Sequence, residues 1–241
     1  DYAQQKMEQL SNNSAENIRH KAIFWLGQAR GKAGFQTLVD IVNDNDRAMD
    51  DRTKAIFGLS ESSYEHAADK LLQLAKFSGA ETIQNKAIFW LAQSNNPQTA
   101  AVIKDVLASS ASMHVKEKSV FSLSQLQTVE AWDMLVDLAR SSELREVREK
   151  AVFWLSQGSN RGKRDAAPIL MDIIDGANPQ SIKEKAVFAL SQLPDEQATS
   201  ALVNVMKSSQ SKAIKKKALF WLGQSNDPRA MEVIEQILAG E

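Results

Sequence analysis

One eight-residue segment recurs seven times along the chain, and this repetition constrains the fold more than any other feature of the sequence. Each copy reads Lys, Ala or Ser, an aliphatic residue, Phe, a variable residue, Leu, a small residue, then Gln or Glu. The copies are separated by 33, 32, 32, 32, 35 and 32 residues, and a fixed period of about 20 to 50 residues is typical of stacked repeat architectures. They begin at Lys21, Lys54, Lys86, Lys118, Lys150, Lys185 and Lys217.

Each period contains a second stretch with helical spacing of its apolar residues, for example Phe35, Leu38 and Val42. We therefore predict two helices in each period. A two-helix unit of about 32 residues cannot bury its apolar face alone, so the copies must stack into a solenoid. We therefore predict an all-α solenoid of about seven two-helix repeats, forming one continuous domain over residues 1–241. The longer fifth spacing predicts a lengthened loop at 158–162.

The second helix of each period resembles the second helix of HEAT-like repeats. The residues that carry the resemblance are clearest from Val147 to Ser156, where an apolar residue and Arg precede Lys, Ala, an aliphatic residue, Phe and Leu. The resemblance covers essentially the whole chain and implies a right-handed α-α superhelix. It says less about function, because HEAT arrays serve as scaffolds, adaptors, transport receptors and occasionally enzymes.

The variable position of the segment alternates between large and small residues. We expect each Trp to pack in the core, where it fills the space left by the small residue of the next repeat. On a helical wheel Ala22, Trp25 and Leu26 fall on one face, which predicts that this face is buried. The alternating residues are Trp25, Gly58, Trp90, Ser122, Trp154, Ala189 and Trp221.

A polar strip containing one Phe per repeat lies almost opposite that face. Because second helices line the concave surface of HEAT-like solenoids, the resemblance implies a ladder of these residues along a groove. Phe rings that seal the gap between adjacent second helices are the alternative. The predicted partner-binding ladder consists of Phe24, Phe57, Phe89, Phe121, Phe153, Phe188 and Phe220, of Gln28, Gln93, Gln125, Gln157, Gln192 and Gln224, and of Lys21, Lys54, Lys86, Lys118, Lys150, Lys185 and Lys217.

The segment from Phe188 to Gln192 reads Phe-Ala-Leu-Ser-Gln and is similar to the Trp-Ala-Leu-Ser-Asn stretch of armadillo repeats such as importin alpha. There the aromatic residue and the amide hold an extended peptide by its side chains and its backbone. The resemblance implies the same groove chemistry here, with Phe for Trp and Gln for Asn, because an amide still offers a donor and an acceptor.

The charge distribution points to the same side of the repeats. The chain carries 29 basic and 30 acidic residues, whereas the predicted second helices alone sum to +7 and the remainder to −8. We therefore predict a protein or extended peptide partner, of acidic character. A nucleic acid bound by the Lys ladder is the alternative, and the near-neutral net charge of −1 weighs against it.

Residues for catalysis are scarce in this sequence. His20, His66 and His114 fall in different repeats, the His-Glu pairs of HEAT-like deoxyhypusine hydroxylases do not occur, and Cys is absent. We predict a non-enzymatic chain without a metal or cofactor site. The longest apolar run is about six residues, which predicts no membrane span. The apolar C-terminal helix, from Met231 to Leu238, leads us to expect flanking repeats in a longer protein.

Overall fold

The structure is a computed structural model that describes residues 2–13, 15–160, 164–209 and 211–239. Within these ranges it contains helices and no strand, which confirms the prediction of an all-α solenoid of two-helix repeats. None of the described helices is long and apolar enough to cross a membrane. The helices group into two compact units, Asp1–Gln127 and Thr128–Glu241. That the whole chain forms one continuous domain stays a prediction.

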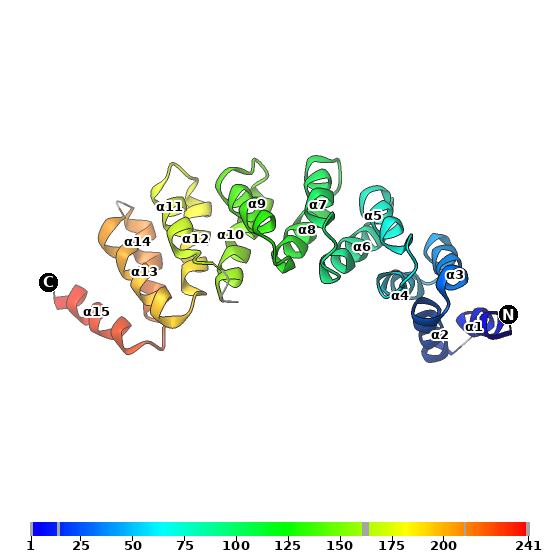
Figure 1. Cartoon of the computed structure of the whole chain (residues 1–241). Coiled ribbons are helices and arrows are strands. Elements are labelled where there is room, and N and C mark those ends of the chain that lie inside the picture. Colours follow the sequence, from blue (N-terminus) through cyan, green and yellow to red (C-terminus); the bar gives the residue numbers. More distant parts are fainter. Residues whose placement is uncertain (1, 14, 161–163, 210, 240–241) are drawn as a thin grey trace. The chain divides into compact units, whose positions relative to one another are not determined.

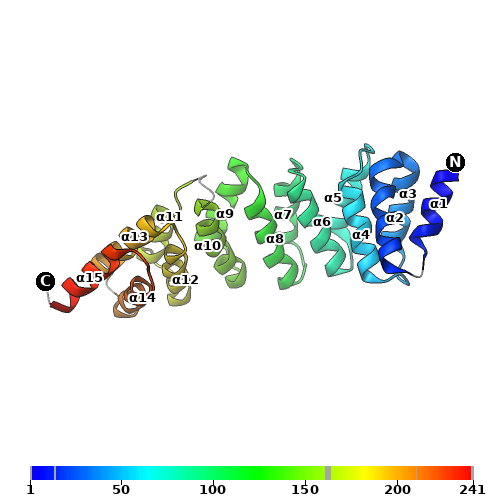
Figure 2. The same cartoon turned by 90° about the horizontal axis from the view of Figure 1, so that it is seen from below.

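The first unit contains four helix pairs, each formed by a first and a second helix of one repeat (Figure 1). In this unit α3, α5 and α7 form one row and α4, α6 and α8 another, and the pairs follow in chain order (Figure 2). The second helices contact one another in succession, α2 with α4, α4 with α6 and α6 with α8. The helices are α1 (Tyr2–Ser11), α2 (Glu16–Ala29), α3 (Gly31–Asn43), α4 (Met49–Ser60), α5 (Ala67–Phe77), α6 (Glu81–Gln93), α7 (Thr99–Ala108) and α8 (Met113–Gln125).

The second unit contains three helix pairs and a final helix. Its second helices also contact one another, α10 with α12 and α12 with α14, and α15 packs on both α13 and α14. The helices are α9 (Val129–Ser141), α10 (Arg145–Asn160), α11 (Ala167–Asp175), α12 (Gln180–Ser191), α13 (Asp195–Ser208), α14 (Lys212–Leu222) and α15 (Pro228–Ala239).

The core of each repeat comes from three positions of the recurring segment. In α2 these are Ala22, Ile23 and Leu26, and none is more than 3% exposed. The same positions are buried in every second helix up to α12. Burial of each large aliphatic side chain stabilises the fold by about 1.5 to 3 kcal/mol. The Ala leaves room for a neighbouring helix, which explains why the segment combines a small residue with two branched ones.

In three repeats, the residue two positions before the Lys of the recurring segment joins the two helices of the repeat. The Arg52 side chain donates from Nε to the carbonyl oxygen of Val42 (2.9 Å), and Arg148 donates in the same way to Ala139 (3.0 Å). In the third repeat Gln84 takes this place and donates from Nε2 to Ala75 (2.8 Å). The acceptors are carbonyls at the C-terminal ends of first helices, which have no partner within their own helix. This position therefore satisfies a helix end, with either a guanidinium or an amide.

Two glycines let α2 and α4 approach closely. A Cβ atom on Gly27 would lie 2.2 Å from the carbonyl oxygen of Gly58, so no larger residue fits there without moving a helix. The prediction of a lengthened loop at 158–162 was wrong at its start, because Gly158 lies inside α10, which continues to Asn160. Its missing side chain makes room for the ring of Trp132, which a Cβ atom would approach to 2.9 Å. The last residues of that predicted loop, 161–162, lie outside the described residues.

Candidate partner-binding surface

The Phe residues of successive second helices stack in pairs. Phe24 lies on Phe57 with ring centroids 6.0 Å apart, and Phe89 lies on Phe121 at 6.4 Å. In the second unit Phe153 lies on Phe188 at 6.2 Å, with the two rings almost parallel. These rings are half-buried, so each is partly covered by its neighbours and partly accessible to solvent.

The Trp residues lie among these rings and not in the core, which corrects the prediction that they are buried. Trp25 is 52% exposed, and Trp90, Trp154 and Trp221 are half-buried. Trp90 packs on Phe57 of the preceding repeat with centroids 4.6 Å apart, and Trp221 packs on Phe188 at 5.2 Å. The buried face of α2 carries Ala22, Ile23 and Leu26, and Trp25 lies outside it, as does Ile18 at 38% exposure.

Stacked Phe pairs and bridging Trp residues therefore form one continuous row of rings in each unit, which we call the aromatic ladder. Each Trp also meets the Phe before it in sequence edge to face, at about 5.0 to 5.4 Å. Such contacts stabilise by about 0.5 to 1.5 kcal/mol beyond the burial of area. The aromatic ladder consists of Phe24, Trp25, Phe57, Phe89, Trp90 and Phe121 in the first unit and of Phe153, Trp154, Phe188, Phe220 and Trp221 in the second.

The Lys residues of the predicted ladder lie in solvent beside the rings, with Lys185 half-buried and the other six exposed. The amides divide into two groups. Gln28, Gln93 and Gln224 are exposed, whereas Gln125, Gln157 and Gln192 are half-buried. Some amides already have partners: Gln28 donates to Glu61 of the next repeat (3.1 Å), and Gln192 donates to Ser191 (3.2 Å). The amides are therefore not uniformly available to a ligand.

A depression of about 440 Å³ opens over α10, α12 and α14 in the second unit. Phe188 and Trp221 form its apolar part. Arg145 is held by Glu149 (2.8 Å), and this hydrogen bond raises the pKa of the guanidinium above its usual value. The remaining lining residues are Ser181, Glu184, Lys185 and Lys217, so three cations and two carboxylates surround the two rings. The surface thus combines stacking area with a small excess of positive charge.

The Lys185 ammonium differs from the other two cations of this depression, because it makes no ion pair among the described residues. Lys217 faces Glu184 at 3.9 Å, whereas Lys185 has no ion-pair partner in the described part of the chain. Its Nζ atom lies 6.0 Å from the centroid of the Phe188 ring, a distance at which the ring face attracts a cation. A ligand carboxylate at this place would meet an unpaired charge.

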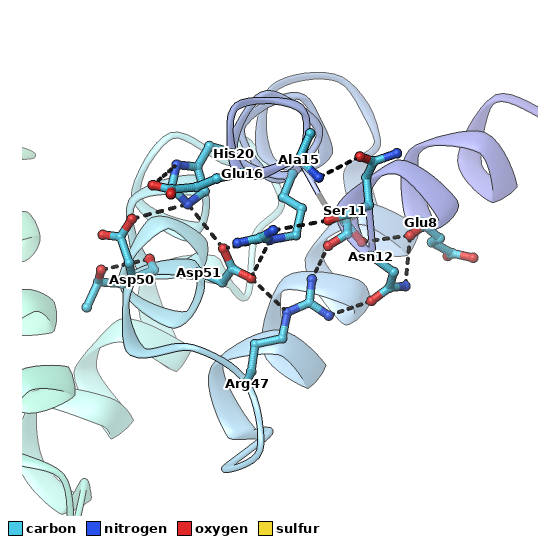
Figure 3. Close-up of polar contacts among 12 residues, drawn as sticks. Glu8, Ser11, Asn12, Ala15, Glu16, His20, Arg47, Asp50 and Asp51 are labelled. Atoms are coloured by element: carbon cyan, nitrogen blue, oxygen red, sulfur yellow. Dashed lines mark hydrogen bonds and ion pairs between the residues drawn. The ribbon is translucent and has the colours of Figure 1, made fainter.

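The sequence analysis missed a cluster of charged residues between the first two repeats (Figure 3). Asp51 is buried and accepts from Arg19 Nε (2.9 Å), Arg47 Nε (3.2 Å) and the His20 ring (3.1 Å). Arg47 also donates to the backbone carbonyl of Ser11 and so ties α1 to α4. Arg19 and Asp51 are 32 residues apart, which is the period of the repeat. Opposite charges at this spacing are the sequence feature that could have predicted the cluster.

Within this cluster Glu16, His20 and Asp50 offer ligand atoms that lie within 4.8 Å of one another, a geometry compatible with a metal ion. The His20 Nε2 atom, however, already lies 3.1 Å from Asp51 and 3.2 Å from Asp50. The guanidinium groups of Arg19 and Arg47 already bind the neighbouring Asp51 carboxylate. A metal cation would therefore be added next to existing positive charge. We interpret this cluster as an ionic junction between the first two repeats. That the chain has no metal site stays a prediction.

The fold defines the class of this protein as an α-solenoid of two-helix repeats. Residues 68–156 match the family model of HEAT repeats, and the same helix pair recurs before and after that stretch. The matched residues and the recurring helix pair support a HEAT-like repeat family, as the sequence predicts. No curated protein matches the sequence.

Solved structures with a similar fold include YibA of Escherichia coli, which is 18% identical with a TM-score of 0.51 over 98% of this chain and 86% of that chain. This likeness supports the fold alone. Human deoxyhypusine hydroxylase in complex with glycerol is 15% identical with a TM-score of 0.40, over 92% of this chain and 83% of that chain. The complex of CpcE and CpcF of phycocyanin lyase from Nostoc sp. is 15% identical with a TM-score of 0.44, over 98% and 94%. The last two likenesses do not bear on the activity of this chain.

Proposed function

We propose that this chain is a non-enzymatic binding module that holds an extended, acidic segment of a partner protein along the aromatic ladder. The depression over α10, α12 and α14 carries the proposal, because it combines two stackable rings with an unpaired ammonium in one place. Binding surfaces are characteristically built from aromatic residues that provide contact area and from a few polar groups that orient the ligand.

The spacing of the rings suits an extended chain. Phe153, Phe188 and Trp221 follow one another at 6.2 and 5.2 Å between centroids. An extended peptide advances about 3.3 Å per residue, so residues on one side of it recur about every 6.6 Å. Every second side chain of the bound segment can therefore rest on a successive ring. Half-buried Gln157 lies one helical turn from Phe153 and can bond the peptide backbone beside this ring.

The charges in the depression favour a peptide over a nucleic acid. A nucleic acid presents a phosphate at every nucleotide, and Glu149 and Glu184 would face this row of charges. A peptide can place a carboxylate at Lys185 and an apolar side chain on Phe188 without such conflict. We therefore expect acidic residues that alternate with apolar ones in the bound segment.

The test is selection of binding peptides from an unbiased library, followed by measurement of Kd with ladder variants. Phe188→Ala should weaken binding by about 2 kcal/mol, or thirtyfold, because it removes a central ring of the depression. Phe77→Ala is the matched control, since Phe77 is 78% exposed and lies outside the aromatic ladder. Unchanged Kd for Phe188→Ala, together with a loss of stability above about 3 kcal/mol, would show that the ring serves only packing.

The salt dependence of Kd separates the two partner classes. Contacts with rings and amides should change Kd only modestly between 50 and 200 mM salt, whereas a ligand held by six or more phosphates loses about 10³-fold or more in affinity over this range. A steep loss of that size, with a selected nucleic acid as the tighter ligand, would replace the proposal with the nucleic-acid alternative.

A further inference from the structure

A second pocket lies in the first unit, away from the aromatic ladder. It has a volume of about 270 Å³ and opens where α3 and α5 end and α4 and α6 begin. Neither Asp nor Glu is among the residues that line it. Its lining combines two cations with neutral polar groups and one large ring at the rim, which include Arg52, Lys70, Asn45, Gln73, Ser78 and Phe77.

The guanidinium of Arg52 is the central group of this pocket. Arg52 is only 9% exposed, and its Nε atom donates to the carbonyl oxygen of Val42. Its two terminal nitrogens have no hydrogen-bond or ion-pair partner among the described residues. The guanidinium therefore carries a charge without a counter-charge in a pocket whose lining has no carboxylate, and this favours an anion.

The Arg and Gln residues at the equivalent position of three other repeats do not share this feature. At the same repeat position Arg19 pairs with Asp51, and Arg148 donates from a terminal nitrogen to the carbonyl of Arg140 and to Asn178. Gln84, also buried, bonds its first-helix carbonyl without any charge. An amide therefore suffices to join the two helices of a repeat, and the positive charge of Arg52 exceeds what that task requires.

Other groups of the pocket suit an anion as well. The Lys70 ammonium donates to Gln73 (3.1 Å) and has no carboxylate partner in the part of the chain that the structure describes. Asn45 adds an amide able to donate hydrogen bonds, whereas the Ser78 hydroxyl already donates to the carbonyl oxygen of Ala80 (3.2 Å). Asp44 is close in sequence to Asn45, but it does not line the pocket, and its carboxylate accepts from the backbone of Asp46 (3.0 Å).

We propose that this pocket binds a phosphate monoester, with its phosphate on Arg52 and Lys70 and its organic part against Phe77. A guanidinium with two free terminal nitrogens matches two phosphate oxygens at once. The volume of about 270 Å³ holds more than a bare phosphate, and Phe77, at 78% exposure, offers a ring face beside it. This site is independent of the proposed peptide-binding surface.

Isothermal titration of the full chain with phenyl phosphate and with inorganic phosphate tests the proposal. Phenyl phosphate should bind the more tightly of the two, and phenol should not bind. Arg52→Gln should weaken phenyl phosphate binding at least tenfold, because a charge-assisted bidentate contact is lost. The Gln84 precedent indicates that this variant keeps the helix junction. Lys70→Met, on a half-buried side chain, should weaken binding severalfold and provides a second variant if Arg52→Gln folds poorly.

Arg148→Gln is the matched control, since it alters the same repeat position in the second unit and should leave phenyl phosphate binding unchanged. Phe77→Ala should weaken binding of phenyl phosphate but not of inorganic phosphate. A peptide containing phosphotyrosine distinguishes a protein source from a small molecule: tighter binding than phenyl phosphate assigns the group to a phosphorylated protein, and equal binding to a metabolite. The proposal fails if neither phosphate compound binds at millimolar concentration, or if Arg52→Gln and Lys70→Met both bind as the unaltered chain does.

Discussion

The recurring segments of the first and last repeats differ at one position in eight, yet their rings are exposed in opposite ways. The first reads Lys-Ala-Ile-Phe-Trp-Leu-Gly-Gln from Lys21, and the last has Leu in place of Ile. In the first, Trp25 is 52% exposed while Phe24 is half-buried. In the last, Phe220 is 55% exposed while Trp221 is half-buried.

The difference arises because the two ring types have neighbours on opposite sides. A Trp packs on the Phe of the preceding repeat, as Trp221 does on Phe188, whereas Phe24 stacks on the Phe of the following repeat. Trp25 has no preceding second helix, and Phe220 has no following one, in the described chain. The comparison teaches that burial in this fold belongs to pairs of adjacent repeats and not to the segment itself.

The largest effect should come from the ionic junction of the first repeat. Asp51→Ala leaves Arg19 and Arg47, both mostly buried, without their shared carboxylate, and should lower the free energy of unfolding by about 3 kcal/mol. In the last repeat the exposed pair Lys217 and Glu184 is 3.9 Å apart, so Glu184→Ala should change stability by less than about 0.5 kcal/mol. Urea titrations of both variants measure the contrast. Equal losses would show that the junctions of the two repeats do not differ in strength.

The second-largest effect should come from the Gly of the recurring segment, which we compare between the first and the last repeat. Gly27→Ala places a Cβ atom 2.2 Å from the backbone of α4 and should destabilise the protein by about 2 kcal/mol through forced separation of the helices. Gly223→Ala should be neutral or slightly stabilising, since its nearest contact is 3.5 Å and its φ of −67° suits alanine. Thermal unfolding of the two variants provides the measurement. A comparable loss for Gly223→Ala would contradict the open surroundings of that residue.

An effect of equal size or smaller is expected for the two Trp residues themselves. Trp221→Ala removes a ring that packs on both Phe188 and Phe220 and should cost about 2 kcal/mol, below the 3 to 5 of a fully buried aromatic residue. Trp25→Ala should cost about half as much, because among the described residues its ring contacts only Phe24 and half of its surface faces solvent. Chemical denaturation with far-UV circular dichroism tests the order. A greater loss for Trp25→Ala would reverse the rule drawn from the comparison.

The smallest effect concerns acid conditions at the last repeat. Hydrogen bonds donated by Arg229 lower the pKa of Asp227 to about 2 in the folded chain. The unfolded carboxyl titrates near pH 4, so this contribution to stability is complete above about pH 4 and is lost as the pH falls towards 2. Asp227 also accepts from the backbone of Arg229 at the start of α15 (3.0 Å), so α15 should fray in this window. Amide chemical shifts of α15 report the change, and Asp227→Asn should abolish its pH dependence. Unchanged α15 shifts between pH 5 and 2 would exclude this role.

The helices were predictable because their signals are local and repeated. The recurring segment located each second helix: the third copy, which begins at Lys86, lies within α6 (Glu81–Gln93). Periodicity and helix length are set by the segment itself and by the need to stack. The half-buried Phe and exposed Lys positions on one face of the second helices were predictable for the same reason.

The bridging Trp residues and the Arg52 pocket were not predictable in this way. A helical wheel of α2 gives the angular position of each side chain. It does not show which side of the helix faces the first helix of the repeat and which faces the next repeat, so the prediction that Trp25 is buried was wrong. Arg52 is identical in type to Arg19 and Arg148, and only their surroundings distinguish a paired guanidinium from an unpaired one. These properties depend on contacts between repeats, which one helix considered alone does not contain.

The alternation of Trp with small residues sets the step by which such an array can grow. Trp25, Trp90, Trp154 and Trp221 are 65, 64 and 67 residues apart, so the ladder repeats every two helix pairs and not every one. Duplication of one repeat would place two Trp-bearing helices, or two bearing small residues, side by side and interrupt the row of rings. Duplication of two, such as α5 to α8, would copy the whole pattern. This surface is therefore extended, by gene duplication or by engineering, in steps of two repeats.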